Sequence, residues 1–155
     1  MIDKAKADGA KMHELIAFRI GAQEYCVDVM SIREIRGWTA ATALPQAPHF
    51  VRGAINLRGT VLSIVDLAAR LGFQPAEPTA RHAIIVAQIG DQVVGLLVEG
   101  VSDIFAVPDD KIQPVPDVAS ETAKRFVLGV IPLDNRLISV IAIDSVLPAV
   151  CAQAA

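Results

Sequence analysis

The sequence is poor in the residues that build disulfide frameworks and metal sites. Its 155 residues include two cysteines, Cys26 and Cys151, and three histidines, His13, His49 and His82. Two cysteines cannot form a disulfide framework, and neither one belongs to a paired metal-ligand spacing. The histidines form no i,i+4 pair, so we expect all three to be surface or loop residues. We therefore predict no metal and no cofactor.

Motifs of catalysis are also lacking. The chain has no glycine-rich phosphate loop and no Gly-x-Ser-x-Gly elbow. Asp66 and Asp144 each follow an expected strand and precede an expected short helix, so helix capping accounts for both carboxylates. Cys26 has no base beside it in the sequence and alternates with Tyr25 and Val27 as a packed strand residue does. We predict that the chain is not an enzyme.

Positive charge and aromatic side chains are scarce as well. The net charge is −3 and the aromatic fraction is 5%, which argues against nucleic-acid binding. Residues 1–11 lack the apolar core of a signal peptide. The segment 137–155 has Asp144 as its single charge, but Pro148 and Gln153 make it a weak membrane span, so a buried strand with a terminal helix is favoured. These features predict a cytoplasmic protein.

Apolar residues, by contrast, are in excess. They make up 53% of the chain, whereas charged residues make up 20%, which is more apolar than the usual balance. The excess predicts strands buried on both faces, apolar surfaces reserved for partners, or both.

The most informative positive feature is an internal repeat. Residues 20–35 match residues 89–104 at five of sixteen positions with a shift of 69, and residues 50–65 match residues 126–141 at six of sixteen with a shift of 76. About one match in sixteen is expected from ordinary residue usage. The two shifts differ by seven, which one insertion in a middle loop explains. The chain is therefore a tandem duplication.

Each repeat is typical of β structure. Both contain two hairpins with Gly, Asn or Asp at their turns, and one more short strand between the hairpins. The expected strands of the first repeat are 15–20, 25–29, 33–38, 53–57 and 60–65. Those of the second repeat are 84–89, 93–98, 101–107, 129–133 and 136–141. Residues 66–72 predict a short helix with an Asp N-cap and a Gly stop.

Five short strands that close on themselves remove the exposed edges of a free sheet. We predict an all-β fold with short helices, built from two tandem five-stranded β-barrels related by pseudo-symmetry. The barrels are expected at approximately 14–73, with strand exchange at its C-terminal end left open, and at approximately 82–148. Together they form one domain at 14–155, after a flexible N-terminus at 1–13. A partner is expected in the cleft at their junction.

Two segments combine charges with an apolar strand. In Ile32–Gly37, the isoleucines stand among charges that cannot all face a core. The segment is either a barrel strand with salt-bridged outer residues or a contact strip of apolar anchors with a charged rim. In Asn56–Gly59, Arg58 at the hairpin tip is either solvated or reaches a carboxylate of a partner.

These segments resemble the CheW family, the coupling proteins of bacterial chemotaxis. The matching stretches are 18–29, 32–37, 50–67 and 93–104, and the resemblance covers roughly 14–147. It implies two SH3-like five-stranded barrels and no catalytic activity. It also implies two partners, the regulatory domain of the histidine kinase CheA and the helical cytoplasmic tip of methyl-accepting receptors, joined in membrane-associated signalling arrays. The same module occurs within CheA and in CheV, and a stand-alone coupler is expected here.

The resemblance also implies site residues. The receptor-binding candidates, in the groove between the barrels, are Val29, Ile32, Glu34, Ile35, Val98 and Val101. The kinase-binding candidates, on the first barrel, are Phe50, Val51, Asn56, Arg58 and Gly59. Two features depart from the family, Ser63 where many relatives have proline, and the linker 74–81 with its two prolines. The alternatives left open are a paralogous coupler of another receptor–kinase pathway (pilus or gliding motility), an unrelated barrel enzyme or ligand-binding domain, and an oligonucleotide-binding barrel.

Overall fold

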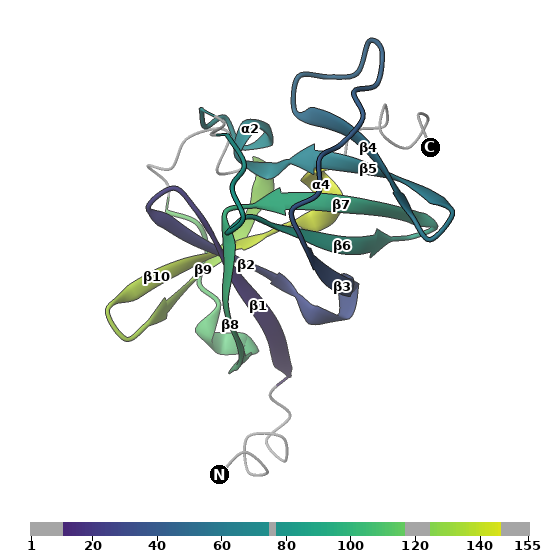
Figure 1. Cartoon of the computed structure of the whole chain (residues 1–155). Helices are drawn as coiled ribbons and strands as arrows, with labels where there is room; N and C mark the ends of the chain where they lie inside the picture. The colour runs from purple at the N-terminus through teal and green to yellow at the C-terminus, as the bar shows by residue number, and fades with distance from the viewer. Residues whose placement is uncertain (1–10, 75–76, 117–124, 147–155) are drawn as a thin grey trace.

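The computed structural model describes residues 11–74, 77–116 and 125–146 (Figure 1). Expectations for the N-terminal segment 1–10, for Cys151 and for the helix after residue 146 lie outside these ranges. The elements of the first half are β1 (Met12–Ile20), β2 (Gln23–Asp28), η1 (Val29–Ser31), β3 (Ile32–Gly37), β4 (Val51–Leu57), β5 (Thr60–Asp66) and α2 (Leu67–Arg70). Those of the second half are β6 (Ala83–Ile89), β7 (Gln92–Val98), β8 (Gly100–Pro108), η2 (Asp109–Lys111), β9 (Val127–Leu133), β10 (Arg136–Ile141) and α4 (Ile143–Val146). The predicted fold class, all-β with short helices, is confirmed.

The strands form two five-stranded sheets. Sheet A has the order β8-β1-β2-β10-β9, and sheet B has the order β3-β6-β7-β5-β4. Neighbouring strands are antiparallel except for two parallel pairs, β2 with β10 and β5 with β7. In Figure 1 the β9–β10 hairpin extends to the lower left, and β4, β5, β7 and β6 fan out to the right.

The two sheets do not coincide with the two duplicated halves. The first hairpin, β1–β2, pairs with β8 and β10 of the second half, while the β6–β7 hairpin pairs with β3 and β5 of the first half. The ranges 14–73 and 82–148 therefore describe the repeats and not the sheets. Hydrophobic alternation in the sequence identifies a strand and its buried face. It does not identify the partner strand, because the two copies of a duplicated hairpin present the same alternation.

A bridge outside the named strands closes each sheet. Thr42, after β3, exchanges two backbone hydrogen bonds of 2.9 Å with Ala54, and Gln113, after β8, exchanges two of 2.8 Å with Val130. The glycine next to each bridge is a matching position of the repeat. A Cβ at Gly53 would collide with the carbonyl of Thr42, and a Cβ at Gly129 would lie 2.6 Å from the carbonyl oxygen of Gln113. Both barrels thus need a glycine where the closing segment crosses.

A large apolar cluster, which we call the central core, joins the two halves. It contains side chains from both sheets and both repeats, among them Ile16, Phe18, Ile85 and Ala87. Phe50 and Phe126 hold equivalent positions in the repeat, and their rings lie on the guanidinium of Arg70 at 4.6 Å and 4.7 Å from its central carbon. Arg70 also donates a hydrogen bond of 2.6 Å to the carbonyl of Val146. A cation between two aromatic rings is stabilised by their quadrupoles, so this contact fastens the halves together.

The predicted helix at 66–72 is confirmed as α2. The buried carboxylate of Asp66 accepts the Ala69 N–H and pairs with Arg52, whose Nε lies 3.0 Å from Asp66 Oδ2. Gly72 then ends the helix with a φ of +92°. The second expected cap is wrong, because Asp144 lies within the first turn of α4 and does not precede it. Within the described ranges, no helix has the length and apolarity needed to cross a membrane.

Candidate partner-binding surfaces

The outer strands β3 and β8 both carry a β-bulge at the same position of the repeat. In β3 the pairing with β6 moves from Ile32↔Ala87 to Glu34↔Val86, which leaves Arg33 as the extra residue. In β8 the pairing with β1 moves from Phe18↔Val101 to Ala17↔Asp103, which leaves Ser102 extra. The two bulged residues are related by the repeat shift of 69.

Each bulge turns two apolar residues to one face. In a regular strand, residues three apart point to opposite faces, and one extra residue cancels that alternation. Ile32 and Ile35 therefore lie on the face of Ala87 and Ile85, their partners on β6. Because both partners belong to the central core, the isoleucines border that core.

The same holds on β8. Val101 and Ile104 lie opposite Phe18 and Ile16 of the central core. Three of these four side chains remain exposed, with exposed fractions of 42% for Ile35, 37% for Val101 and 59% for Ile104. We call Ile32, Ile35, Val101 and Ile104 the apolar edge residues. Exposed apolar side chains of this kind, next to charged neighbours, are typical of a contact surface.

The predicted receptor candidates fall into three groups. Ile32, Ile35 and Val101 are apolar edge residues, and Val29 in η1 is half-buried against the central core. Val98 is 2% exposed within that core, so the expectation that it lines a contact surface is wrong. Ile104 was not predicted, although it matches Ile35 in the repeat, and that match was the available signal.

The predicted kinase candidates center on the β4–β5 turn. Arg58 and Gly59 have φ values of +52° and +88°, and the side-chain oxygen of Asn56 accepts the Gly59 N–H at 2.8 Å. Val51, at the other end of β4, is half-buried against the central core. Phe50 is 7% exposed and packs on Arg70, so it belongs to the interior and does not offer contact surface.

Glu34 and Arg58 connect the two predicted surfaces. Nη2 of Arg58 donates to both carboxylate oxygens of Glu34, at 2.8 Å and 3.0 Å. This hydrogen bond and the charge of Arg58 lower the pKa of Glu34, and Glu34 in turn raises the pKa of Arg58. The Arg58 side chain is still 69% exposed, so a partner can reach it. Val61, opposite Asn56 in the hairpin, is 74% exposed.

The side chains of Cys26, His13 and His82, of types that often act in catalysis or bind metals, are here buried or hydrogen-bonded to neighbouring residues. Cys26 is fully buried, and burial raises the pKa of its thiol to about 12, which keeps it protonated near neutral pH. His13 lies 2.8 Å from a carboxylate oxygen of Asp109, and His82 Nδ1 accepts the Thr79 N–H at 3.0 Å. In the part of the chain that the structure describes, no three His, Cys, Asp or Glu side chains gather as metal ligands would.

Comparisons with known proteins agree with this geometry. The family model described as CheW-like domain matches residues 14–151. The chain is 58% identical over 132 residues to a probable chemotaxis protein CheW of Rhizobium etli, covering 85% of each chain. It is also 58% identical over 135 residues to the chemotaxis protein CheW of Rhizobium meliloti, covering 87% of each. The fold is similar to that of the scaffolding protein TtCheW from Thermoanaerobacter tengcongensis, with a TM-score of 0.77 and 27% identity over 84% of this chain and 89% of that one. The two bulged edge strands and the duplicated barrels thus belong to a member of the CheW family.

Proposed function

We propose that this protein is a non-catalytic adaptor of bacterial chemotaxis. It couples methyl-accepting chemoreceptors to the histidine kinase CheA and works in the cytoplasm, within receptor arrays at the membrane. The observation that carries the proposal is the pair of bulged outer strands, which keep apolar side chains exposed beside the central core. An adaptor needs such exposed anchors, whereas a core does not.

The receptor binds at the apolar edge residues. Its cytoplasmic tip is helical, and an amphipathic helix presents apolar side chains at spacings of three and four residues to an apolar surface. Ile35, Val101 and Ile104 supply that surface. Arg33 and Asp103 are exposed beside them and form the charged rim that fixes orientation.

The kinase regulatory domain binds at the β4–β5 hairpin. Val61 provides an exposed apolar anchor, and Arg58 provides a charged group on the same turn region. Asn56 and Gly59 fix the turn through their hydrogen bond, so that the hairpin tip is preorganised for docking. Val51, half-buried at the far end of β4, supports the strand and makes at most a marginal contact.

The adaptor transmits the state of the receptor by holding both partners in register. In thermodynamic terms it carries a coupling free energy of about 1–3 kcal/mol between its two sites. The Glu34–Arg58 ion pair supports this mechanism, because it ties the strand of the receptor site to the hairpin of the kinase site.

Reconstitution tests the proposal. Purified protein is added to receptor-containing membranes and a CheA-type kinase, and autophosphorylation is measured with and without attractant. We expect kinase activity to rise several-fold and to fall again with attractant. A kinase activity that never responds, while the protein binds neither partner, contradicts the adaptor role. Activation limited to the receptor and kinase of another pathway identifies a paralogous coupler instead.

A further inference from the structure

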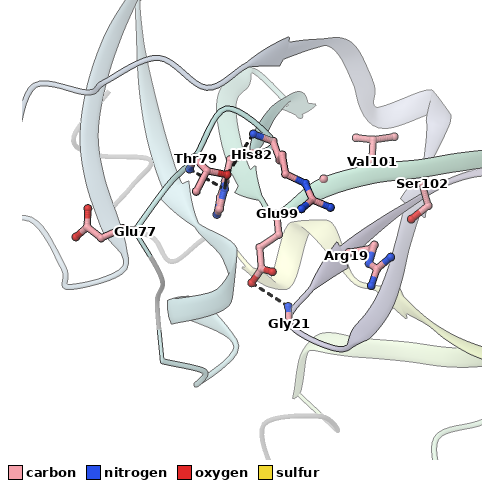
Figure 2. A pocket seen from close by; sticks show the side chains of 10 residues that line it. Arg19, Gly21, Glu77, Thr79, His82, Glu99, Val101 and Ser102 are labelled. Carbon is pink, nitrogen blue, oxygen red and sulfur yellow. Dashed lines mark hydrogen bonds between the residues drawn. The ribbon is translucent and has the colours of Figure 1, made fainter.

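A polar hollow adjoins the apolar edge residues on β8. Its volume is about 620 Å³, and it is lined by the β1–β2 turn, the β7–β8 junction and the segment that leads into β6 (Figure 2). Val101 is one of its lining residues, so the hollow begins where the proposed receptor surface ends. In Figure 2, Thr79 and His82 lie on one side, Arg19, Val101 and Ser102 on the other, and Glu99 between them.

Two arginines line this hollow around Gly100. Arg19 is the cross-strand partner of Gly100, and the carbonyl oxygen of Arg81 lies 3.6 Å from the position that a Gly100 Cβ would take. Both arginines are exposed, and although their backbones form hydrogen bonds, neither guanidinium has a hydrogen-bond or ion-pair partner within the described part of the chain. Two guanidinium groups without internal partners leave their donors directed to solvent or to a ligand.

Two acceptors of the hollow, by contrast, already accept a hydrogen bond. The Glu99 carboxylate accepts the Gly21 N–H at 2.9 Å, and Figure 2 shows it turned toward Gly21. His82 Nδ1 accepts the Thr79 N–H, which leaves the other ring nitrogen as the donor of the neutral imidazole. Glu77 stands apart from the other labelled residues in Figure 2. The lining nearest Val101 therefore presents the guanidinium of Arg19 and the Ser102 hydroxyl, while Glu99 is turned toward Gly21.

We propose that Arg19 and Arg81 bind a carboxylate side chain of the receptor helix that docks on Val101. The inference rests on the proposed function and adds a specificity site to it. A guanidinium binds a carboxylate through paired, charge-assisted hydrogen bonds, and such bonds fix the register of a helix that apolar contacts alone let slide. The Ser102 hydroxyl, on the bulge, supplies a further donor at the same side of the hollow.

The test compares variants of the full-length protein in binding to a soluble cytoplasmic fragment of the receptor. We expect the double variant R19A/R81A to bind the fragment at least about 10-fold more weakly. Its binding to the kinase regulatory domain should stay within about twofold. Lys111→Glu is the matched control, because it changes a charge on exposed η2 outside the hollow, and it should bind both partners normally. Reversing Arg81 to Glu should be rescued by a Glu→Arg or Asp→Arg change at one position of the receptor fragment.

The outcomes separate this inference from the proposed function. If R19A/R81A binds the receptor normally while Ile35→Asp does not, the hollow has no role in receptor binding. The inference about the arginines is then wrong, but the proposed receptor surface stands. If neither variant changes receptor binding, the proposed receptor surface is wrong as well. A second experiment titrates the protein with acetate and with inorganic phosphate, and monitors the NMR signals of the Gly21 and Ser102 amides. Shifts in that experiment, combined with normal receptor binding by R19A/R81A, would identify a site for small free anions and overturn the assignment to a receptor side chain.

Discussion

Arg58 at the tip of the β4–β5 hairpin holds Glu34 of β3 through one nitrogen shared between both carboxylate oxygens. Glu34 lies on β3, at one end of the order of sheet B, and Arg58 lies in the turn that follows β4, at the other end, so their contact closes that barrel at its surface. Glu34 belongs to the strand of the proposed receptor site, and Arg58 belongs to the proposed kinase site. The ion pair therefore links the two proposed surfaces directly.

Charge reversal at this pair shows whether Arg58 contacts the kinase directly or acts only through its ion pair with Glu34. Arg58→Glu should weaken kinase binding and lower receptor-stimulated kinase activity, because it places a like charge beside Glu34 and at the interface rim. The swapped double variant E34R/R58E restores the pair but not the positive charge at the hairpin tip. Kinase binding should therefore remain weak in the swapped variant if Arg58 contacts the kinase. Unchanged binding and activity in both variants would show that Arg58 takes no part in kinase binding.

Charged substitutions at the apolar edge residues should leave the protein folded but weaken its binding to the receptor. Ile35→Asp and Ile104→Asp should each weaken receptor binding by about 2 kcal/mol or more, since a charge would be buried on docking. Ile32→Asp is expected to have the same effect, with an added cost to stability because Ile32 packs on the central core. Isothermal titration with a receptor fragment measures the loss. Val61→Asp is the control, because it removes an aliphatic residue that is even more exposed, at 74%, from the other surface and should leave receptor affinity unchanged.

The closing bridges predict which glycines the fold requires. Gly53→Ala and Gly129→Ala should each lower the free energy of unfolding by about 2 kcal/mol or more, because the added methyl group meets a backbone carbonyl that cannot move aside. Gly37→Ala is the matched control, since nothing lies within 4 Å of its Cβ position, and it should stay within about 0.5 kcal/mol. Urea denaturation measures all three variants. Equal stabilities would mean that the closing segments do not pass where the structure places them.

The Glu34–Arg58 pair also predicts a pH dependence. The folded-state pKa of Glu34 is lowered by Arg58, so the pair stabilises the fold above the ordinary glutamate pKa of about 4.3 and loses that contribution as the pH falls through the lowered value. The stability difference between wild type and Arg58→Ala should therefore be present at pH 7 and vanish in this acidic window. NMR titration of the Glu34 carboxyl carbon should give a pKa that rises toward its ordinary value in Arg58→Ala. The same pKa in both proteins would contradict the pair.

The sequence predicted the strands well because hairpins leave local signals. Positions such as Arg58-Gly59 and Gly90-Asp91 stand between alternating apolar runs, and the duplication shows each signal twice. Strand exchange was left open only for the C-terminal end of the first barrel, and the exchange of whole hairpins was not predicted, because both copies of a hairpin have the same face pattern and only the closed structure selects the partner.

The sequence predicted the exposure of the candidate site residues only in part, because burial and β-bulges decide which apolar side chains reach the surface. Of the residues predicted as contacts, Ile35 and Val101 are exposed, whereas Val98 and Phe50 are equally apolar and lie inside. A bulge adds one residue without a sequence signal of its own, so the face of Ile104 depends on Ser102 being unpaired. The hollow at Arg19 and Arg81 joins residues far apart in the chain, which no local pattern reveals.

The exchange of hairpins between the halves has a consequence for synthesis of the chain. Sheet B needs β7, which ends at Val98, and sheet A needs β10, which ends at Ile141. A ribosome delivers residues from the N-terminus onward, and pairings between distant segments form slowly. The nascent first half can therefore form its own hairpins, β1–β2 and β4–β5, but no complete sheet. Sheet B is completed once Val98 has emerged, and sheet A only once Ile141 has emerged. A chain cut within the linker 74–81 should accordingly yield two fragments that are unstable alone and reassemble into one protein when mixed.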